Sequence, residues 1–242
     1  MCNKSVSQNV VTVNGLVATV RVPVGVIPAN TGYHYSDSNR KLVPTKEVNF
    51  FIWNLPAVFT CPNRTEMCEA ECYAKKAEQV YPEVLPARWD NFAMSKLPTF
   101  VQDMTAFITD RAIKMRKPEL IVRIHESGDF YSRRYANDWL QIVRNVESAD
   151  LKGKKVTFIA YTKSFRYFDG VVLPESFKLR ASVWADTKQS DLDTIARNGW
   201  NVYTAVDHFT DHDDFHQCRC QDCAGCGKCW DSTVPLICCE IH

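Results

Sequence analysis

Between residues 48 and 206, short apolar segments alternate with longer segments of helical periodicity, and this alternation most restricts the fold. Five apolar segments have the β-branched and aromatic content of buried strands: VNFFIW, ELIVRIH, KVTFIAY, KLRASVW and WNVYTAV. The helical segments span Glu66 to Gln79, Leu85 to Met115 with a break near Pro98, Ser132 to Glu147, and Ser190 to Asn198. Strands that alternate with helices join through right-handed crossovers into a mostly parallel sheet. We therefore expect an α/β fold whose sheet is open or closed into a partial (β/α) barrel, with the partial barrel as our prediction; five strands are too few for a complete eight-stranded barrel.

The two ends of the chain differ from this α/β body, which we assign to residues 46–206. Residues 1–45 alternate apolar and polar side chains around Asn14-Gly15, a pattern that predicts a small antiparallel β hairpin or sheet. The tail, residues 207–242, has little apolar periodicity and holds seven of the 11 cysteines. A bound metal is expected to replace the missing core of this tail.

Composition restricts the compartment and the partners. Lys and Arg number 29 and Asp and Glu 28, so a formal charge of +1 gives no overall attraction to nucleic acid. The sequence has neither a signal-peptide pattern nor an apolar run long enough for a membrane span. We expect a cytoplasmic protein with no membrane partner. Because structural disulfides are rare in a reducing cytosol, clustered cysteines there more often bind metal or do chemistry.

Three cysteines follow the first strand of the body directly. Cys61, Cys68 and Cys72 have the spacing C-x6-C-x3-C, and Cys68 and Cys72 would share one face of a continuous helix. A structural zinc site takes four protein ligands, whereas a 4Fe-4S cluster held by three thiolates leaves one iron open. The pattern predicts an iron-sulfur cluster at this strand end. Free buried thiols are the less favoured interpretation.

The tail contains a second and denser group of cysteines. The spacing C-x-C-x2-C-x2-C-x2-C is closer to iron-sulfur ligation than to a zinc ribbon, and its predicted ligands are Cys218, Cys220, Cys223, Cys226 and Cys229. Cys238 and Cys239 follow as further candidates. A row of histidines lies beside them and is equally consistent with ligands or with a polar surface: His208, His212 and His216.

Polar residues follow the other predicted strands where each one ends. In parallel α/β folds these ends carry the reactive groups, and the candidates for cofactor binding are Ser127, Gly128, Asp129, Thr162, Lys163 and Asp186. The alternative is that they form turns and helix caps. Arg123 and His125 alternate with Val122 and Ile124 and are expected to face away from them. Inside a barrel they would face the site, and otherwise they would form a satisfied polar pair.

The order of these features resembles that of the radical S-adenosylmethionine (SAM) enzymes. More closely, the segments CPN…MCEAECYAKKAE, RIHESGDFYS, YTKS, SVWAD and CAGCGKCW are similar to those of the bacteriophage gene product 88 family, over roughly residues 45 to 230. The radical-SAM resemblance implies that the open iron binds SAM, that Ser127, Gly128 and Asp129 contact its amino-acid part, and that an electron donor reduces the cluster. The usual spacing in those enzymes is C-x3-C-x2-C, so the cluster is a firmer expectation than SAM cleavage. The phage resemblance implies the cytoplasm of an infected bacterium.

Two other classes of function are consistent with the sequence. One is a zinc-binding module that contacts nucleic acid or a host protein, with phosphate contacts from Lys163, Arg166, Arg123, Arg133 and Arg134. The other is a non-catalytic electron-transfer or iron-sensing protein. The sequence does not define the substrate or the oligomeric state. It also leaves open whether the cysteines hold one 4Fe-4S cluster, more than one, or a larger shared cluster.

Overall fold

The computed structural model describes residues 6–13, 16–23, 32–207, 215–219 and 222–241, with side chains from residue 32 onward. Its strands are β1 Val6–Val13, β2 Leu16–Pro23, β3 Tyr35–Ser36, β4 Val48–Trp53, β5 Glu119–Ile124, β6 Lys155–Thr162, β7 Phe177–Val183, β8 Asn201–Val206, β9 His216–Gln217 and β10 Leu236–Glu240. Its α-helices are α1 Glu66–Ala70, α2 Tyr73–Val80, α3 Val84–Met94, α4 Phe100–Lys114, α5 Arg133–Glu147, α6 Gln189–Asn198 and α7 Cys223–Cys226. Two 3-10 turns complete the described elements: η1 Phe165–Tyr167 and η2 Lys228–Trp230.

An eight-stranded sheet in the order β3-β4-β5-β6-β7-β8-β10-β9 organises the chain. The strands from β4 to β8 lie parallel and in sequence order, and only the short β3 pairs antiparallel. All five strands predicted for the body are confirmed. Over the residues the structure describes, the edge strands β3 and β9 are not bonded to each other, so the sheet is open and a barrel is not confirmed.

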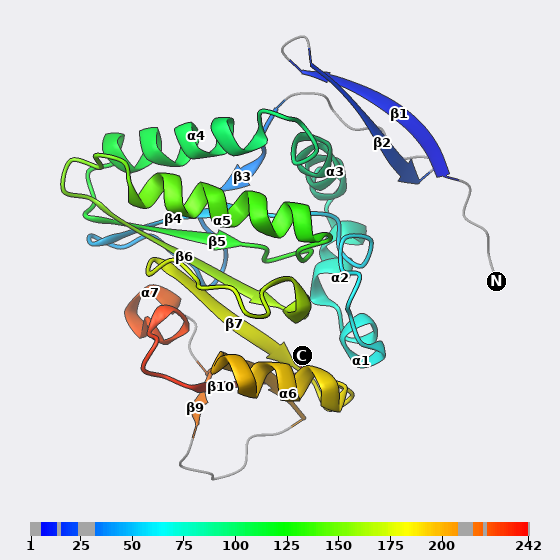
Figure 1. Cartoon of the computed structure of the whole chain (residues 1–242), viewed down its shortest axis with the longest axis vertical. Coiled ribbons are helices and arrows are strands. Elements are labelled where there is room, and N and C mark those ends of the chain that lie inside the picture. The colour runs from blue at the N-terminus through cyan, green and yellow to red at the C-terminus, as the bar shows by residue number, and fades with distance from the viewer. Residues whose placement is uncertain (1–5, 14–15, 24–31, 208–214, 220–221, 242) are drawn as a thin grey trace.

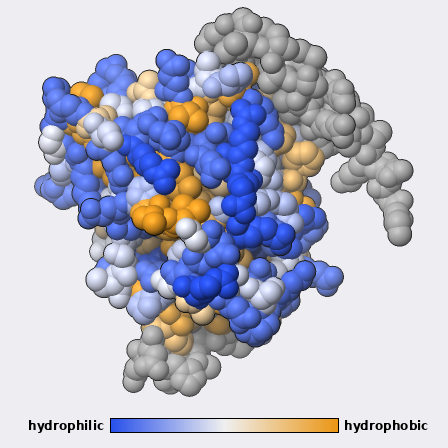
Figure 2. All heavy atoms as spheres, in the orientation of Figure 1, coloured by the Kyte–Doolittle hydropathy of each residue, from blue (hydrophilic) through white to orange (hydrophobic). Residues whose placement is uncertain are grey.

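Helices α3, α4 and α5 cover one face of this sheet, which we call the helix face. Side chains at alternate positions of β5, such as Leu120 and Val122, enter the main apolar core, where Met104 of α4 and Trp139 of α5 pack against them. Figure 1 shows α4 and α5 side by side over the strands. Figure 2 shows that their outer surface is largely hydrophilic, with a limited apolar patch. Each helix therefore buries an apolar stripe and leaves its polar side to solvent.

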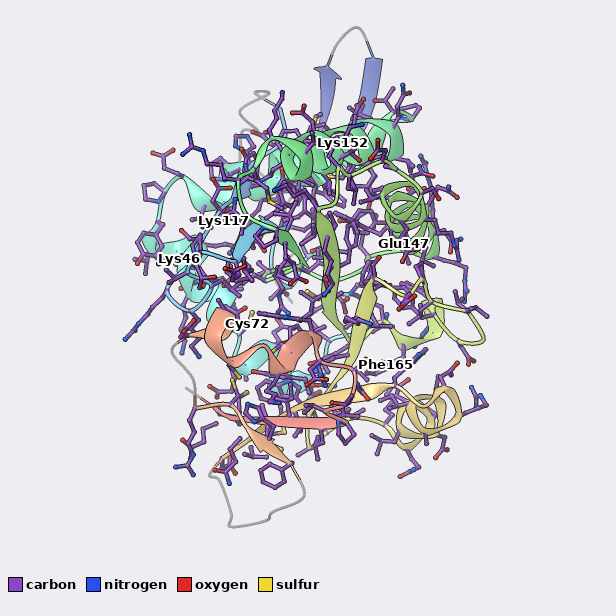
Figure 3. The ribbon with its side chains drawn as sticks, turned by 90° about the vertical axis from the view of Figure 1, so that its left-hand side faces the viewer. Lys46, Cys72, Lys117, Glu147, Lys152 and Phe165 are labelled. Carbon is purple, nitrogen blue, oxygen red and sulfur yellow. The ribbon has the colours of Figure 1, made fainter. Side chains whose placement is uncertain are left out.

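The C-terminal tail covers the opposite face, which we call the tail face. Ile121 and Ile159 point to this side, and Cys229 and Trp230 pack against their cluster. Figure 3 shows α5 and α7 on opposite sides of the sheet. The tail also supplies β10, which inserts between β8 and β9 and buries Ile237 completely. The expectation that this tail lacks apolar packing was wrong, because its last strand completes the sheet of the body.

The N-terminal segment and the helix boundaries follow the local sequence closely. β1 and β2 pair antiparallel from Val6–Pro23 to Val13–Leu16, as predicted, and form a separate hairpin that extends from the body in Figure 1. Ser132 caps α5 by accepting the N–H of Tyr135 at 3.2 Å. Gly199 ends α6 in the left-handed conformation at φ +62°. No helix in the described part of the chain is long and apolar enough to cross a membrane.

Candidate metal centre

The three cysteines of the first group lie after β4, on three different pieces of local structure. Cys61 is in the loop, Cys68 is inside α1, and Cys72 is the N-cap of α2. Cys72 is extended, at φ −69° and ψ 99°, so the predicted helix from 66 to 79 is interrupted there. The expectation that Cys68 and Cys72 share one face of a continuous helix was therefore wrong. Folding of the loop, not helical spacing, brings these thiols into one region.

Electrostatic coupling shows that these thiols are neighbours. Burial raises the pKa of the Cys61 thiol well above its ordinary value, and Asp129, Cys68 and Cys72 raise it further. All three thiols are free and half-buried. As the structure stands, no set of three or more Cys, His, Asp or Glu side chains in the described ranges is close enough to hold a metal ion. The thiols are gathered at one strand end but are not collected into a ligand set.

Asp129 connects the loops after β5 and β6. One carboxylate oxygen accepts from the Thr162 hydroxyl at 2.6 Å and from the Phe130 N–H at 2.7 Å. The other accepts from the Lys163 N–H at 2.9 Å and the Ser164 hydroxyl at 3.2 Å. Burial raises the pKa of Asp129, and these four hydrogen bonds act in the opposite direction. The predicted site residues Asp129 and Thr162 are brought together, and they bind each other.

Lys163 extends from the same loop toward the thiols. Its ammonium donates to the carbonyl and the hydroxyl of Ser182, both at 3.0 Å, and lies 5.5 Å from the centre of the Trp184 ring. Burial lowers the pKa of Lys163, whereas Cys68 and Asp129 act to raise it. Among the described residues no carboxylate lies within ion-pair distance of this ammonium. A nearly buried cation thus faces the thiols with neutral hydrogen-bond partners.

Ser127 and Gly128 fix the loop after β5 against the loop after β4. The Ser127 hydroxyl donates to the Leu55 carbonyl at 2.9 Å, and the Leu55 N–H donates to the Ser127 carbonyl at 2.9 Å. Gly128 has φ +86°, and a Cβ there would lie 2.6 Å from the Thr60 hydroxyl oxygen. Close packing of two protein loops accounts for this glycine. The N–H, hydroxyl and carbonyl of Ser127 are therefore all hydrogen-bonded within the protein.

Asp186, after β7, reaches the first turn of α1. Its carboxylate accepts the Met67 N–H at 2.9 Å, while the Thr65 hydroxyl accepts the Cys68 N–H at 3.2 Å. Two otherwise unpaired N–H groups of the helix are satisfied in this way. Asp186 therefore ties the helix that carries Cys68 to the end of a strand of the sheet.

The tail cysteines lie in the segment that covers the tail face. Cys223 and Cys226 begin and end α7, Cys229 lies in η2, and Cys218 donates its N–H to the Cys238 carbonyl at 2.6 Å. Burial, together with the neighbouring thiols Cys229 and Cys218, raises the pKa of Cys223 to about 12. The predicted ligand Cys220 and the histidines His208 and His212 lie outside the described residues.

His216 is the member of the predicted histidine row that the structure describes. It lies in β9, and its Nε2 is 3.5 Å from the Sγ of Cys226. A second thiol group, with an imidazole beside it, is thus present on the tail face.

Arg180 anchors this tail and was not identified from the sequence. From β7 it donates to four backbone carbonyls, at 2.7 to 2.9 Å, although the residue is only 2% exposed. These carbonyls belong to Lys228, Cys229, Asp231 and Val234. The sequence did contain a sign of this role, because KLRASVW places an arginine in the middle of a predicted buried strand. A guanidinium buried there requires several hydrogen-bond acceptors.

Arg123 and His125 do not share a face as expected. Arg123 lies on the tail face, with its guanidinium 3.7 Å from the centre of the Tyr161 ring. His125 follows the end of β5 with φ +63° and is almost fully buried, with its Nε2 2.9 Å from the hydroxyl of Tyr135 in α5. The left-handed backbone breaks the strand alternation and turns His125 to the helix side.

Comparison with known proteins places the chain in a family. The family described as Gene product 88 matches residues 33–232, which include the cysteines after β4 and most of those in the tail. The chain belongs to the gene product 88 family. Curated relatives are the Gene 88 proteins of Mycobacterium phages D29 and L5, each 32% identical over 111 residues. Each match covers 43% of this chain and 43% of the relative, and no solved structure is significantly similar. The family resemblance inferred from the sequence is confirmed, whereas a radical-SAM relationship finds no support in these comparisons.

Proposed function

We propose that this gene product 88 protein is an iron-sulfur protein whose cluster is held by Cys61, Cys68 and Cys72. The observation that carries the proposal is the convergence of three free thiols, from a loop, a helix and a helix cap, at the end of β4. Three thiolates fit iron-sulfur ligation better than a four-ligand zinc site. Since the thiols are not yet in a ligand set, the loop would have to adjust around the metal. Such local ordering on metal binding is common in metalloproteins.

The parallel sheet supports this proposal, with its strands from β4 to β8 in sequence order and α4 and α5 on one face. In parallel α/β folds the ends of the strands carry the site, whether the sheet is open or closed. A 4Fe-4S cluster bound there would supply one-electron transfer and an open iron for a small molecule. The proposal needs an electron donor as a partner and places the protein in the reducing cytoplasm of an infected bacterium.

Lys163 has a defined role in this proposal. A cluster held by three thiolates adds negative charge beside Cys68, where the Lys163 ammonium has no carboxylate partner among the described residues. The ammonium would compensate that charge, and Asp129 would fix the loop that carries it. Asp186 would hold α1 so that Cys68 faces the site.

SAM as the small molecule is the narrower form of the proposal. It assigns SAM contacts to Ser127, Gly128 and Asp129. The polar side chains of Ser127 and Asp129 are already hydrogen-bonded within the protein. SAM binding would require these hydrogen bonds to rearrange. SAM chemistry is therefore tested after the cluster and separately from it.

A zinc-binding module is the second candidate, favoured by the contact of His216 with Cys226 in the tail. The positions of the basic residues argue against nucleic acid as the partner of such a module. Lys163 is nearly buried, and Arg133 donates to the carbonyls of Arg166 and Tyr167. These residues do not form one exposed basic patch.

The test is the metal and sulfide content of protein purified without oxygen, with its absorption spectrum. We expect about four iron and four sulfide per cluster, lost when Cys61, Cys68 and Cys72 are all changed to Ser. A matched variant with Cys223, Cys226 and Cys229 changed to Ser should keep the cluster at the strand end. Zinc without sulfide, or iron that persists in the first variant, would overturn the proposal. If iron and sulfide are present, formation of 5′-deoxyadenosine from SAM under strong reductant decides the narrower form.

A further inference from the structure

Arg123 lies near the middle of the sheet, on the tail face. Ile121, two residues earlier in β5, packs in the apolar cluster of that face, whereas Val122 and Ile124 belong to the core under the helices. Its neighbours across the sheet, Ile52 of β4 and Ile159 of β6, belong to the same cluster, against which Cys229 and Trp230 pack. Arg123 is half-buried. Its charge acts to lower the pKa of Cys223 in the tail and of Tyr73, the residue that follows Cys72.

The guanidinium of Arg123 is oriented but its donors are not used. It stacks on Tyr161 at 3.7 Å, and Tyr161 is supported by an edge contact with Tyr203 at 4.7 Å. Within the described residues, Arg123 donates no hydrogen bond and forms no ion pair. Arg180, directly across from Tyr161 in the next strand, gives its donors to four carbonyls. The two arginines flank the same ring. Arg180 is hydrogen-bonded to backbone carbonyls, whereas the N–H groups of Arg123 have no partner among the described residues.

The surroundings of Arg123 contain a second cation, Lys41, and a carboxylate, Glu126. The Glu126 carboxylate accepts from the Asn39 amide at 2.5 Å and forms no ion pair with either cation among the described residues. Lys41 and Arg123 both act to lower the pKa of Cys223, so both lie near that thiol. The Cys223 N–H donates to the Lys41 carbonyl at 2.9 Å, which fixes the position of Lys41 against the tail. Nothing in the described ranges forms an ion pair with the Lys41 ammonium. Two cations near one thiol, neither of them in an ion pair among the described residues, make a site suited to an anion.

We infer that Arg123 binds a carboxylate or phosphate group of a small molecule on the tail face of the sheet. A planar guanidinium whose face is stacked on an aromatic ring keeps its N–H edge for two parallel bonds to an oxyanion. Tyr161 fixes the plane of the guanidinium, and Lys41 adds a second positive charge near Cys223. The inference goes beyond the proposed cluster and does not depend on it, because neither cation is a metal ligand.

The experiment is isothermal titration calorimetry on the anaerobically purified full chain, with inorganic phosphate and with succinate as separate probes. We expect saturable binding of one of them and about a tenfold or greater loss of affinity in Arg123→Met. Arg123→Lys keeps the positive charge but cannot form two parallel hydrogen bonds, so its affinity should lie between those of the wild type and Arg123→Met. The control is Arg116→Met, at an exposed arginine, which should bind like the wild type. The two probes distinguish a phosphate ligand from a carboxylate ligand.

A measurement on the unchanged protein covers the case in which Arg123→Met does not fold. Phenylglyoxal labelling of Arg123, followed by mass spectrometry of its peptide, should slow when the bound probe is present. Labelling of Arg116 should not change. Absence of saturable binding by both probes, or binding that persists in a folded Arg123→Met, would overturn the inference. Unprotected labelling in the presence of a bound probe would do the same.

Discussion

The Arg180 guanidinium donates to the carbonyl of Cys229 at 2.7 Å and is the centre of the contact between the sheet and the tail. Arg180→Met should leave four carbonyls without their donor, and we expect a loss of about 3 kcal/mol in the free energy of unfolding. The loss should be local, with faster hydrogen exchange in residues 228–240. Denaturant titration and exchange measured by mass spectrometry check both parts. Arg144→Met, which removes one exposed bond to Val172, is the control and should change stability little.

Gly128 should not tolerate a side chain. Gly128→Ala would place a Cβ 2.6 Å from the Thr60 hydroxyl oxygen and 2.7 Å from the Leu55 Cβ. We expect a loss of about 2 to 4 kcal/mol, because overpacking adds to the strain of a positive φ. Gly153→Ala is the matched control, since Gly153 has φ +76° and open space around it, and about 1 kcal/mol is expected. Equal losses in the two variants would show that backbone strain alone explains Gly128.

His125 should make the stability of the protein depend on pH in a defined window. Burial lowers its pKa from 6.5 to about 3, so between these values the unfolded chain binds a proton that the folded chain does not. Its contribution to stability is therefore present above pH 6.5 and is lost as the pH falls toward 3, by up to about 1.4 kcal/mol per pH unit. His125→Asn, a residue that accepts the left-handed backbone, should show a smaller loss in denaturant titrations at pH 7.5 and 5. An NMR titration that places the His125 pKa near 6.5 would contradict this prediction.

Asp186 should affect metal content more than stability. Asp186→Ala removes the acceptor for the Met67 N–H and loosens the helix that carries Cys68. The free energy of unfolding should fall by about 1 kcal/mol or less, as for a helix cap. If the proposed cluster is correct, iron and sulfide content should fall clearly. Asp169→Ala removes exposed bonds to Arg197 and Asn198 and serves as the control, with unchanged iron.

Local patterns were sufficient to find the five strands of the body and the caps Ser132 and Gly199, because each depends on side chains that are near in sequence. They did not predict the interruption at Cys72, where the chain has neither Gly nor Pro. The following residue, Tyr73, donates its hydroxyl to the Glu126 carbonyl at 2.5 Å. A contact across 53 residues of sequence thus accompanies the break, and helix periodicity has no information about it.

The sequence by itself determined that three cysteines follow β4 and that Asp129, Lys163 and Asp186 lie at neighbouring strand ends, since parallel strands align their carboxyl ends. Only the tertiary structure decided how these groups are used. Asp129 has its acceptors filled by the loop after β6, and Asp186 binds the start of α1. It also decided that Arg180 holds the tail while Arg123 keeps its donors free. The physical reason is that hydrogen-bond partners distant in sequence are chosen by packing, and residue spacing does not encode them.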